Sequence, residues 1–583
     1  MMKRCTILTI IGILALALAG CQVETTRTPK VLPEWSRGQQ LGFAALNQPV
    51  HIVSEGDRVH AIWVAAETNA LQYVRLNAAG QADVDQQLAV PTSHPSNVQL
   101  LLNADGSLCA LWTDNPGFPR AIFVARLDPR GELLTAPTQI SPAGAQVADF
   151  EAKTGQSGQH YVFWADEIPS AGGLHYLRLD GNGTLEEPDR LLVARGESPT
   201  ASIAADGMLH LGWVVEPESR ISDVYYGVFD PAKGHLNRQT RVASYKTATG
   251  LVSYPPSISL DETTVYLFWS LEQRGGGLGP GEARSYYVAF PLSQPGQADP
   301  IEIVIPSAAR PAYTSVKGEL PYQHLASTEA GWPTLVLYMP SALPSQGAET
   351  GVFFIGEVAT QRQSSRQVVW AIYRDGQPVG YQLPTDADGS LRPTAAVDED
   401  GNVHLVWLVA AGFGRYQVFY ASTSTAARMA LDQVSLQDRV LAVLDLLWNL
   451  APALGFFPPV FLLWTFASLV WIILFYFIKV EGGLDRRPAQ IALVVSIVLY
   501  LCSKIFLLPA PLFYAPFQDR LPANLQFIPV LGTPIVTLLL ALAAIAVYQR
   551  RRDHSSLLAV YLIFVVTDAL LSLVIYVPRW LAG

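Results

Sequence analysis

The feature that most constrains the fold is a repeated segment, in which an apolar run, an Asp-Gly turn and an alternating strand end in tryptophan. The clearest copies are residues 100–112 (LLLNADGSLCALW), 202–213 (SIAADGMLHLGW) and 395–407 (AAVDEDGNVHLVW). An Asp-Gly turn between alternating runs is the strongest short-range signal for a β-hairpin. Repetition of one such unit along the chain indicates a repeat architecture.

Looser copies at 51–63, 151–164 and 257–269, and a degenerate copy at 332–338, extend the series. The aromatic residues that end the copies are about 50 residues apart at first and about 70 later: Trp63, Trp112, Trp164, Trp213, Trp269, Tyr338 and Trp407. After each comes a loop and another strand with an aromatic residue: Tyr73, Phe123, Tyr176, Tyr225, Tyr286, Phe353 and Tyr420. Three or four short strands per unit at this period predict the blades of a β-propeller.

We interpret residues 36–430 as one seven-bladed propeller in a mainly β protein. Six or eight blades are alternatives, because residues 300–390 are hard to divide. A β-sandwich array is the other alternative, but no period near 100 residues is present. The repeats resemble those of sialidase-like and BNR propellers, in which an Asp-Gly turn precedes an aromatic residue. The order Ser-x-Asp-x-Gly-x-x-Trp of their Asp box is not met, because about five residues separate Gly401 from Trp407. The resemblance therefore supports the fold more than the chemistry.

The two kinds of connection within a blade predict which face carries function. The tight Asp-Gly turns between first and second strands mark one face, and the variable loops between second and third strands mark the other. Those loops and their flanks contain the candidate ligand-binding arginines Arg220, Arg274, Arg284 and Arg415. A propeller mouth lined by acids and arginines suits a glycan, a peptide or a partner protein. We therefore expect a binding or scaffolding module.

A cell-surface glycan hydrolase of the sialidase-like type is the alternative function. A glycosidase needs two carboxylates about 5–10 Å apart, or a tyrosine nucleophile as in sialidases. The carboxylates available for this alternative are Asp166, Glu167 and Glu216. Their spacing is not diagnostic, because loop charges on exported domains are usually just solvated. We favour binding over catalysis.

Other chemistries have little support in the sequence. His60, His210 and His404 each lie three residues before a tryptophan anchor, one per blade, which indicates a packing position rather than a metal site. The glycine-rich run 275–281 lacks the Gly-Lys-Ser/Thr ending of a phosphate loop. The net charge of −10 argues against a nucleic-acid partner. We expect no cofactor and no metal.

The amino-terminal residues have the form of an export signal. Lys3 and Arg4 precede the 14 apolar or small residues 6–19, which is the length of a signal peptide and short for a membrane span. The closing sequence LAGC at 18–21 resembles the bacterial lipobox. This resemblance implies cleavage before Cys21 and acylation of that cysteine.

The lipobox divides this part of the chain into a signal peptide at 1–20 and a lipid-anchored tether at 21–35. The remaining cysteines are Cys5, which cleavage removes, Cys109 in a strand pattern and Cys502 in an apolar span. They provide no disulfide framework and no zinc spacing. We expect the core alone to hold the exported domain together.

The composition changes abruptly near residue 459. Four segments there have the length and apolar character of transmembrane helices, which predicts an all-α four-helix membrane domain over 459–583: 459–478, 489–508, 527–548 and 557–577. The preceding stretch 437–457 is also apolar, but Asp445, Asn449 and Pro452 argue against spanning. We interpret it as an interfacial amphipathic helix.

The charges between the spans predict the orientation. The loop 479–488 contains Lys479, Arg486 and Arg487, and the loop 549–555 contains three further arginines. The positive-inside rule places both loops in the cytoplasm. The propeller is then expected outside a bacterial cytoplasmic membrane, to which the lipobox would also deliver it.

Two charged residues lie within the predicted spans. Lys504 is near the outer end of the second span and could snorkel to the interface, whereas Asp568 is near the middle of the fourth. Asp568 could pair with Lys504, be protonated or meet a partner subunit. This leaves a third function hypothesis, an accessory subunit of a membrane transport or sensor complex.

Overall fold

The computed structural model describes residues 34–583 apart from 116–119, 167–172, 219–220, 247–250, 274–281, 297, 304–336, 344–346, 360–363, 386–388, 413, 434–435, 479–482, 508–524, 526, 552–554 and 583. The expected signal peptide and Cys21 lie outside the described residues. The chain divides into a β unit, which ends at Gln433, and a helical unit from Val434 onward. Each unit is described by itself.

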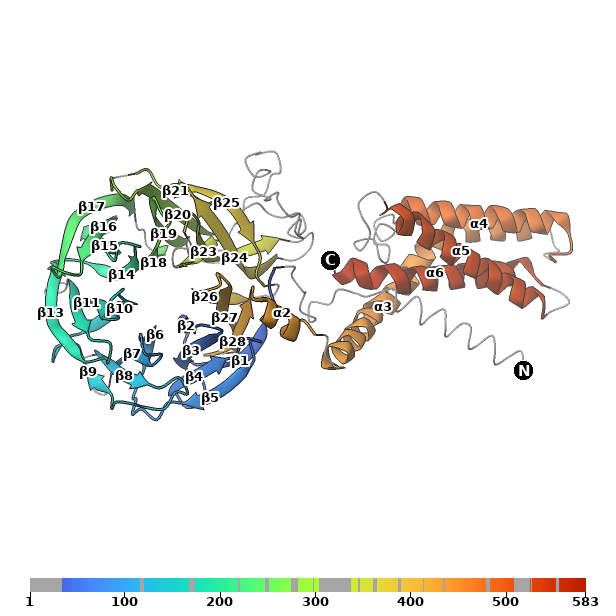
Figure 1. Ribbon diagram of the computed structural model, residues 1–583. Coiled ribbons are helices and arrows are strands. Elements are labelled where there is room, and N and C mark those ends of the chain that lie inside the picture. Colours follow the sequence, from blue (N-terminus) through green and yellow to red (C-terminus); the bar gives the residue numbers. More distant parts are fainter. Residues whose placement is uncertain are drawn as a thin grey trace. The chain divides into compact units, whose positions relative to one another are not determined.

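Seven antiparallel sheets of four strands make up the β unit (Figure 1), so the predicted seven-bladed propeller is confirmed and the alternatives of six or eight blades are excluded. The first four blades are β2 (His51–Glu55), β3 (Arg58–Val64), β4 (Leu71–Leu76) and β5 (Ala82–Gln87); β6 (Ser96–Leu102), β7 (Leu108–Asp114), β8 (Ala121–Leu127) and β9 (Thr138–Gln139); β10 (Val147–Thr154), β11 (His160–Asp166), β12 (Leu174–Leu179) and β13 (Leu185–Val193); and β14 (Glu197–Ile203), β15 (Leu209–Glu218), β16 (Ile221–Asp230) and β17 (His235–Lys246).

The last three blades follow the same order until the ring closes. They are β18 (Leu251–Leu260), β19 (Thr264–Gln273), β20 (Glu282–Pro291) and β21 (Ile301–Glu302); β22 (Leu337–Ala342), β23 (Thr350–Ala359), β24 (Ser364–Arg374) and β25 (Gln377–Gln382); and β26 (Ser390–Val397), β27 (Val403–Gly412) and β28 (Arg415–Ser422), completed by β1 (Gln39–Ala44). The seventh blade therefore takes its outermost strand from the amino-terminal end of the propeller.

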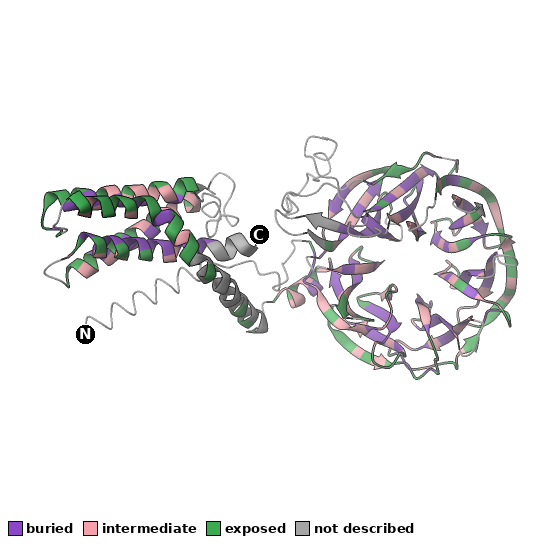
Figure 2. Cartoon of the chain, turned by 180° about the vertical axis from the view of Figure 1, so that it is seen from behind, coloured by how far each residue is buried: buried purple, intermediate pink, exposed green. Residues whose placement is uncertain are grey.

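The first strand of each blade contacts the first strands of both neighbouring blades, including β26 with β2. These strands form a closed ring, as Figure 1 shows. The outer strands are more exposed than the inner ones, and Figure 2 shows this rim in green. Radial closure of this kind leaves few open strand edges.

The two ends of the propeller chain lie side by side. The Arg37 backbone N–H donates to Asp432 Oδ1 over 2.8 Å, just beyond the short helix α2 (Thr425–Leu431). Trp35 is 1% exposed, and its Nε1–H donates to Gln382 Oε1 over 3.0 Å. These contacts therefore hold residues 35–37 and 432–433 against the propeller.

Stacked aromatic pairs join the second and third strands of most blades. The tryptophan anchor faces its cross-strand partner with ring centroids 6.0 Å apart for Trp112–Phe123, 5.7 Å for Trp213–Tyr225, 6.1 Å for Trp269–Tyr286 and 5.6 Å for Trp407–Phe419. In the third blade His175 stacks on Trp164 at 4.2 Å. Such pairs stabilise a sheet beyond the area that they bury, which explains why the anchor recurs.

The sixth blade departs from the predicted arrangement. Tyr338 was expected on the second strand, in the tryptophan position, but it lies on the first strand, β22. The cross-strand pair is reversed here, with Phe353 on β23 stacked on Trp370 of β24 at 5.7 Å. The expectation was wrong because the tryptophan, which we used to locate the second strand, sits on the third strand in this blade.

The histidines before the anchors are buried packing residues. Nδ1 lies within hydrogen-bond distance of a tyrosine hydroxyl on the third strand in three blades, over 2.7 Å for His60–Tyr73, 2.6 Å for His210–Tyr226 and 2.9 Å for His404–Tyr420. Burial lowers the pKa of all three imidazoles, to about 4 for His210. The predicted structural role is therefore confirmed.

The helical unit contains α3 (Leu436–Ile478), α4 (Arg487–Leu507), α5 (Phe527–Gln549) and α6 (Leu557–Ala582). Four stretches are long and apolar enough to span a membrane, in agreement with the sequence: Pro458–Ile478, Arg487–Leu507, Ile528–Gln549 and Leu557–Tyr576. The segment expected as a distinct interfacial helix, 437–457, continues into the first span as a single helix of 43 residues.

Candidate functional site

The amino ends of the first strands and the carboxyl ends of the second strands meet at one face of the propeller. A β-bulge interrupts the first strand near this end in six of the blades, as register shifts in their pairing with the second strands show. Four of these bulges contain a non-glycine residue with positive φ: Asn97 at 46°, Ser198 at 50°, Met339 at 59° and Arg392 at 48°. Bulges change the direction in which side chains point. This end of the ring is therefore the mouth of the propeller and the candidate site.

Arg392 stands out among the residues of the mouth. It is partly buried, and its Nε is buried without a hydrogen-bond partner. Its guanidinium lies over the Tyr254 ring, 6.0 Å from the centroid. Burial lowers the pKa of this guanidinium. Within the described part of the chain no carboxylate pairs with Arg392, so a buried cation is left without an anion.

Four further residues are linked to Arg392 through a chain of contacts that begins at Tyr254, and they form, with it, what we call the mouth cluster. The Tyr254 hydroxyl donates to Glu272 Oε2 over 2.6 Å. The Tyr338 ring is tilted against Tyr254 with centroids 5.6 Å apart. Arg366 Nη1 donates to the Tyr338 hydroxyl over 3.3 Å. The cluster thus joins β18 and β19 of the fifth blade, β22 and β24 of the sixth, and β26 of the seventh.

The mouth cluster combines three chemical abilities. Arg392 and Arg366 offer guanidinium groups, which pair with carboxylates and sulfates in a bidentate manner. The two tyrosine rings offer flat apolar surface with a polar end. Burial raises the pKa of Tyr254, and its hydrogen bond to Glu272 does so further. Tyr254 is therefore a neutral donor held in place by a carboxylate.

Acidic side chains gather on the opposite part of the ring, in the third and fourth blades. Asp149 Oδ1 accepts a hydrogen bond from Asn97 Nδ2 over 2.6 Å. Burial and the nearby Glu151 raise the pKa of Asp149 to about 6. Burial and the Glu216 carboxylate raise the pKa of Glu197. Carboxylates therefore lie in more than one part of the mouth, because Glu272 belongs to the mouth cluster.

The carboxylates named for the hydrolase alternative occupy two neighbouring blades. Asp166 ends β11 of the third blade, and Glu216 lies near the end of β15 in the fourth. Glu216 Oε1 accepts a hydrogen bond from Ser222 over 3.3 Å. Glu167 lies outside the described residues.

Neither of the two predicted loop arginines that the structure describes belongs to the mouth cluster. Arg415 lies 3.7 Å from the centroid of the Phe43 ring, and its Nη2 is 3.1 Å from Glu67 Oε1, so it helps to hold the ring closure. Arg284 Nη1 is 3.8 Å from Glu302 Oε2, between the two outer strands of the fifth blade. Arg220 and Arg274 lie outside the described residues.

The sequence contained a weak signal for the residues that were missed. Arg392 directly precedes Pro393, and Tyr254 directly precedes two prolines, all within first strands that are otherwise apolar or small. Proline inside a strand marks a bulge or an edge. A large polar residue beside such a proline can be turned out of the blade toward a ligand. Only the closed ring, however, brings residues 254, 338 and 392 together.

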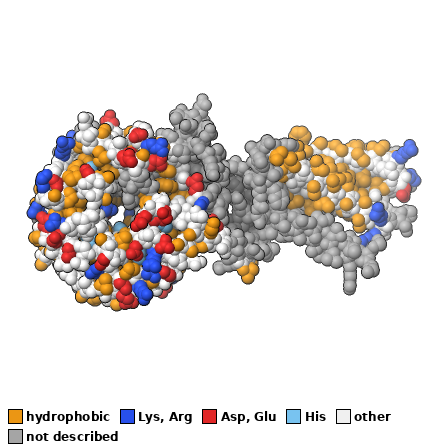
Figure 3. Space-filling model, viewed as in Figure 1, with side chains coloured by type: hydrophobic (Ala, Val, Ile, Leu, Met, Phe, Trp, Pro, Cys, Tyr) orange, Lys and Arg blue, Asp and Glu red, His pale blue; other side chains and the backbone are white. Residues whose placement is uncertain are grey.

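No group of three or more metal-ligating side chains occurs among the residues that the structure describes. Figure 3 shows one face of the propeller, with acidic and basic side chains interspersed over it and the channel open at its centre.

A second polar cluster lies inside the helical unit. Lys504 Nζ donates to Asp568 Oδ2 over 2.7 Å and to Ser572 Oγ over 2.6 Å, and the Tyr500 hydroxyl donates to the same Oδ2 over 2.7 Å. Lys504 is 4% exposed and Asp568 is 1% exposed. Lys504 therefore does not snorkel as expected, because an internal carboxylate satisfies it. Of the three roles considered for Asp568, the geometry shows pairing with Lys504.

No protein-family profile matches the chain. No curated protein matches it. Among solved structures, an ulvan lyase from a new polysaccharide lyase family, bound to -[GlcA(1-4)Rha3S]-, is 10% identical with a TM-score of 0.41 over 67% of this chain and 95% of that chain.

Two other solved structures show a similar degree of likeness. An endo-arabinase from Bacteroides thetaiotaomicron is 12% identical, with a TM-score of 0.30 over 45% of this chain and 100% of that chain. A Hadza microbial sialidase is 12% identical, with a TM-score of 0.35 over 62% of this chain and 75% of that chain. The seven paired sheets, rather than these similarities, establish the fold.

Proposed function

We propose that the propeller binds an acidic glycan at its mouth, with a carboxylate or sulfate of the ligand on Arg392. The observation that carries this proposal is the buried Nε of Arg392, which has no hydrogen-bond partner in the described part of the protein. A buried cation without a counter-ion is costly, and a ligand anion would remove that cost. Under this proposal the primary function of the propeller is binding.

The tyrosines favour a sugar over a small inorganic anion. The Tyr254 and Tyr338 rings lie beside the guanidinium and supply a surface on which a sugar ring can pack. Arg366, which donates to the Tyr338 hydroxyl, brings a second guanidinium to the mouth cluster. Ligand sites are commonly apolar surfaces with a few placed polar groups, as here.

A glycan hydrolase is the second candidate function, and one observation favours it. The Tyr254 hydroxyl is 2.6 Å from Glu272 Oε2. A tyrosine paired with a carboxylate is the arrangement in which the acid could take the phenolic proton during nucleophilic attack. The carboxylates first considered, Asp166, Glu167 and Glu216, are not needed for this version of the hypothesis.

The same proposal includes the membrane setting. The propeller precedes the first of four candidate spans, and the connection after that span contains Arg486. With basic connections in the cytoplasm, the propeller would lie on the outer side of a bacterial cytoplasmic membrane, with acyl chains on Cys21. Metabolic labelling with an alkyne fatty acid tests the lipid: Cys21→Ala would abolish labelling, and persistent labelling would contradict the assignment.

Glycan binding can be tested with the purified full-length protein in detergent on an array of neutral and acidic oligosaccharides. We expect binding to uronic-acid, sialic-acid or sulfated glycans and none to neutral chains of the same length. Arg392→Met should abolish the signal. Arg415→Met is the matched control, because it removes an arginine of the ring closure and leaves the mouth cluster intact. Equal binding by Arg392→Met and the wild type would contradict the proposal.

The hydrolase candidate is tested separately on whichever acidic glycan binds. Release of new reducing ends by the wild type, and its loss in Tyr254→Phe with binding retained, would support catalysis. Binding without release of reducing ends by the wild type would leave a binding module and reject the hydrolase.

A further inference from the structure

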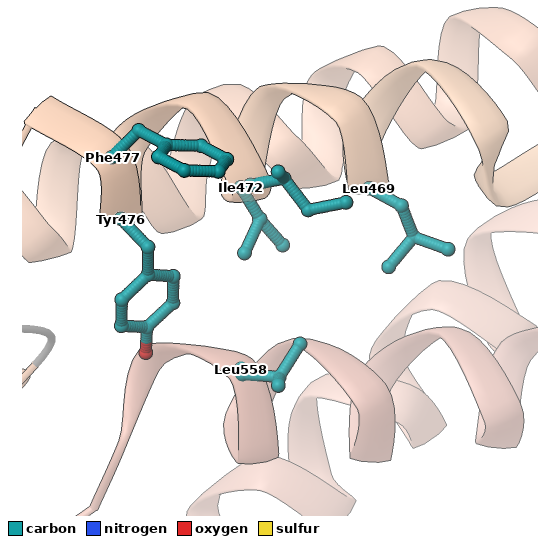
Figure 4. Close-up of a pocket in the computed structure, with 6 residues that line it drawn as sticks. Leu469, Ile472, Tyr476, Phe477 and Leu558 are labelled. Carbon is teal, nitrogen blue, oxygen red and sulfur yellow. The ribbon is translucent and has the colours of Figure 1, made fainter.

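An apolar groove lies between α3 and α6 in the helical unit. It has a volume of about 250 Å³ and is lined by Leu469, Ile472, Ile473, Tyr476, Phe477 and Leu558. Figure 4 shows these side chains, with Tyr476 reaching from α3 toward the beginning of α6. Ile473 is 53% exposed and Phe477 is 83% exposed, so the groove opens to the outside of the bundle.

The groove lies at the basic end of the bundle. Phe477 is the penultimate residue of α3, and Leu558 is the second residue of α6. The connections beyond these two points lie together, because the Leu484 N–H donates to Ser555 O over 3.2 Å. Both connections carry arginines, so cationic groups lie close to the open apolar surface.

Three arginines of these connections are available to a ligand, namely Arg487, Arg550 and Arg551. Arg486, Arg487, Arg550 and Arg551 are exposed. Figure 3 shows blue side chains at one end of the helical unit, while its sides are mostly apolar. In the described chain, Arg487, Arg550 and Arg551 form no ion pair.

We propose that this groove and the arginines beside it bind one anionic phospholipid. An acyl chain would lie in the groove, and the phosphate headgroup would contact the arginines at the end of the bundle. Basic pockets between spanning helices on the cytoplasmic side are suited to such headgroups. Tyr476, whose ring is amphipathic, lies between the two parts of the site, at the depth where tyrosine is enriched.

Charge decides between an anionic and a zwitterionic lipid. A zwitterionic headgroup would fill the same groove, but its own cation would face the arginines. An anionic headgroup gains the attraction of each nearby arginine, which corresponds to about fivefold in affinity per residue. The proposal is independent of the glycan site, since it uses none of the mouth residues.

Native mass spectrometry of the full-length protein tests this directly. The protein is equilibrated in detergent with equal amounts of phosphatidylglycerol and phosphatidylcholine that have the same acyl chains. We expect one phosphatidylglycerol retained per chain, at least fivefold over phosphatidylcholine. Arg550→Gln with Arg551→Gln should remove most of this preference, so that the two lipids are retained almost equally. The control pair Arg58→Gln with Arg130→Gln removes the same charge from exposed propeller sites and should change nothing.

A groove-filling variant tests the acyl-chain part. Ile473→Trp places a large side chain at a half-exposed position, so the bundle core is untouched, and it should lower retention of both lipids. Equal retention of the two lipids by the wild type, or no effect of the arginine substitutions, would overturn the proposal. A dimer that Ile473→Trp abolishes would assign the groove to a second copy instead and would also overturn it.

Discussion

Arg392 in the propeller and Lys504 in the helical unit are both withdrawn from solvent, but their surroundings differ. Lys504 Nζ is 2.7 Å from Asp568 Oδ2 and also donates to Ser572. Arg392 has a tyrosine ring beside it and, within the described residues, no carboxylate. The protein itself satisfies one cation, whereas the other has no counter-ion among the described residues.

We interpret Lys504 as a structural charge and Arg392 as a ligand-binding charge. A buried ion pair holds helices in one arrangement and adds little net stability. A buried cation without a partner costs stability, and a fold keeps it only when another demand maintains it. Removing each cation should therefore have opposite consequences, and the following predictions test this contrast.

The largest effect is expected at Lys504. Lys504→Met leaves the Asp568 carboxylate buried without a counter-ion, which should cost about 3–5 kcal/mol of the free energy of unfolding. Unfolding in mixed micelles by a denaturing detergent measures this. The double variant Lys504→Met with Asp568→Leu should recover stability to within about 1 kcal/mol of the wild type. If Lys504→Met is as stable as the wild type, the fold does not need Lys504, and the expected contrast with Arg392 is wrong.

The reverse result is expected at Arg392. Arg392→Met should lower the affinity for the bound acidic glycan by about 10- to 100-fold, because a charge-assisted hydrogen bond contributes about 1.5–3 kcal/mol. The free energy of unfolding should stay within about 1 kcal/mol of the wild type or rise. Calorimetric titration and thermal unfolding of the same preparation measure both. A large loss of stability would show that the guanidinium is structural after all.

An intermediate effect on the free energy of unfolding is expected from a buried histidine that has an internal hydrogen-bond partner. This effect depends on pH. Burial lowers the pKa of His210 from 6.5 to about 4, so the folded state prefers the neutral ring. The stabilisation is fully present above pH 6.5 and is lost as the pH falls toward 4, with an amplitude of about 3 kcal/mol. His210→Gln should flatten this part of the stability profile. His94→Gln, at an exposed position, is the control, and an equal change in both would contradict the account.

The smallest effect is expected from the tyrosine of the mouth cluster. Tyr254→Phe keeps the ring beside Arg392 and removes the hydrogen bond to Glu272, so affinity should fall by only about threefold to tenfold. Titration with the same glycan measures this change. A loss larger than that of Arg392→Met would show that the tyrosine–carboxylate pair, rather than the guanidinium, dominates recognition.

The sequence predicted the architecture because each blade carries its own local signals. Asp-Gly turns and alternating strands are readable within about 15 residues, and the four spans are readable from apolar length alone. Two features of the ring were not readable in this way. The pairing of β1 with β28 joins residues that are about 380 positions apart, such as Gln39 and Tyr420. The reversed aromatic pair of the sixth blade removed the tryptophan on which the repeat alignment depended.

The candidate site was harder to predict, because it belongs to the ring and not to any one blade. Loop arginines such as Arg415 were the natural candidates, yet Glu67 and Phe43 of the ring closure engage this one. Arg392 lies in a first strand, where a charged residue is easily overlooked. The intramembrane pair was easier to anticipate, because charges are rare in spans and Lys504 was one of the few groups that could satisfy Asp568.

A structure of the full-length protein with a bound acidic oligosaccharide tests the central claim most directly. The account predicts a carboxylate or sulfate oxygen about 2.7–3.2 Å from the guanidinium of Arg392, with a sugar ring against Tyr254 or Tyr338. A ligand bound elsewhere on the propeller, with Arg392 still lacking an anion, would contradict it.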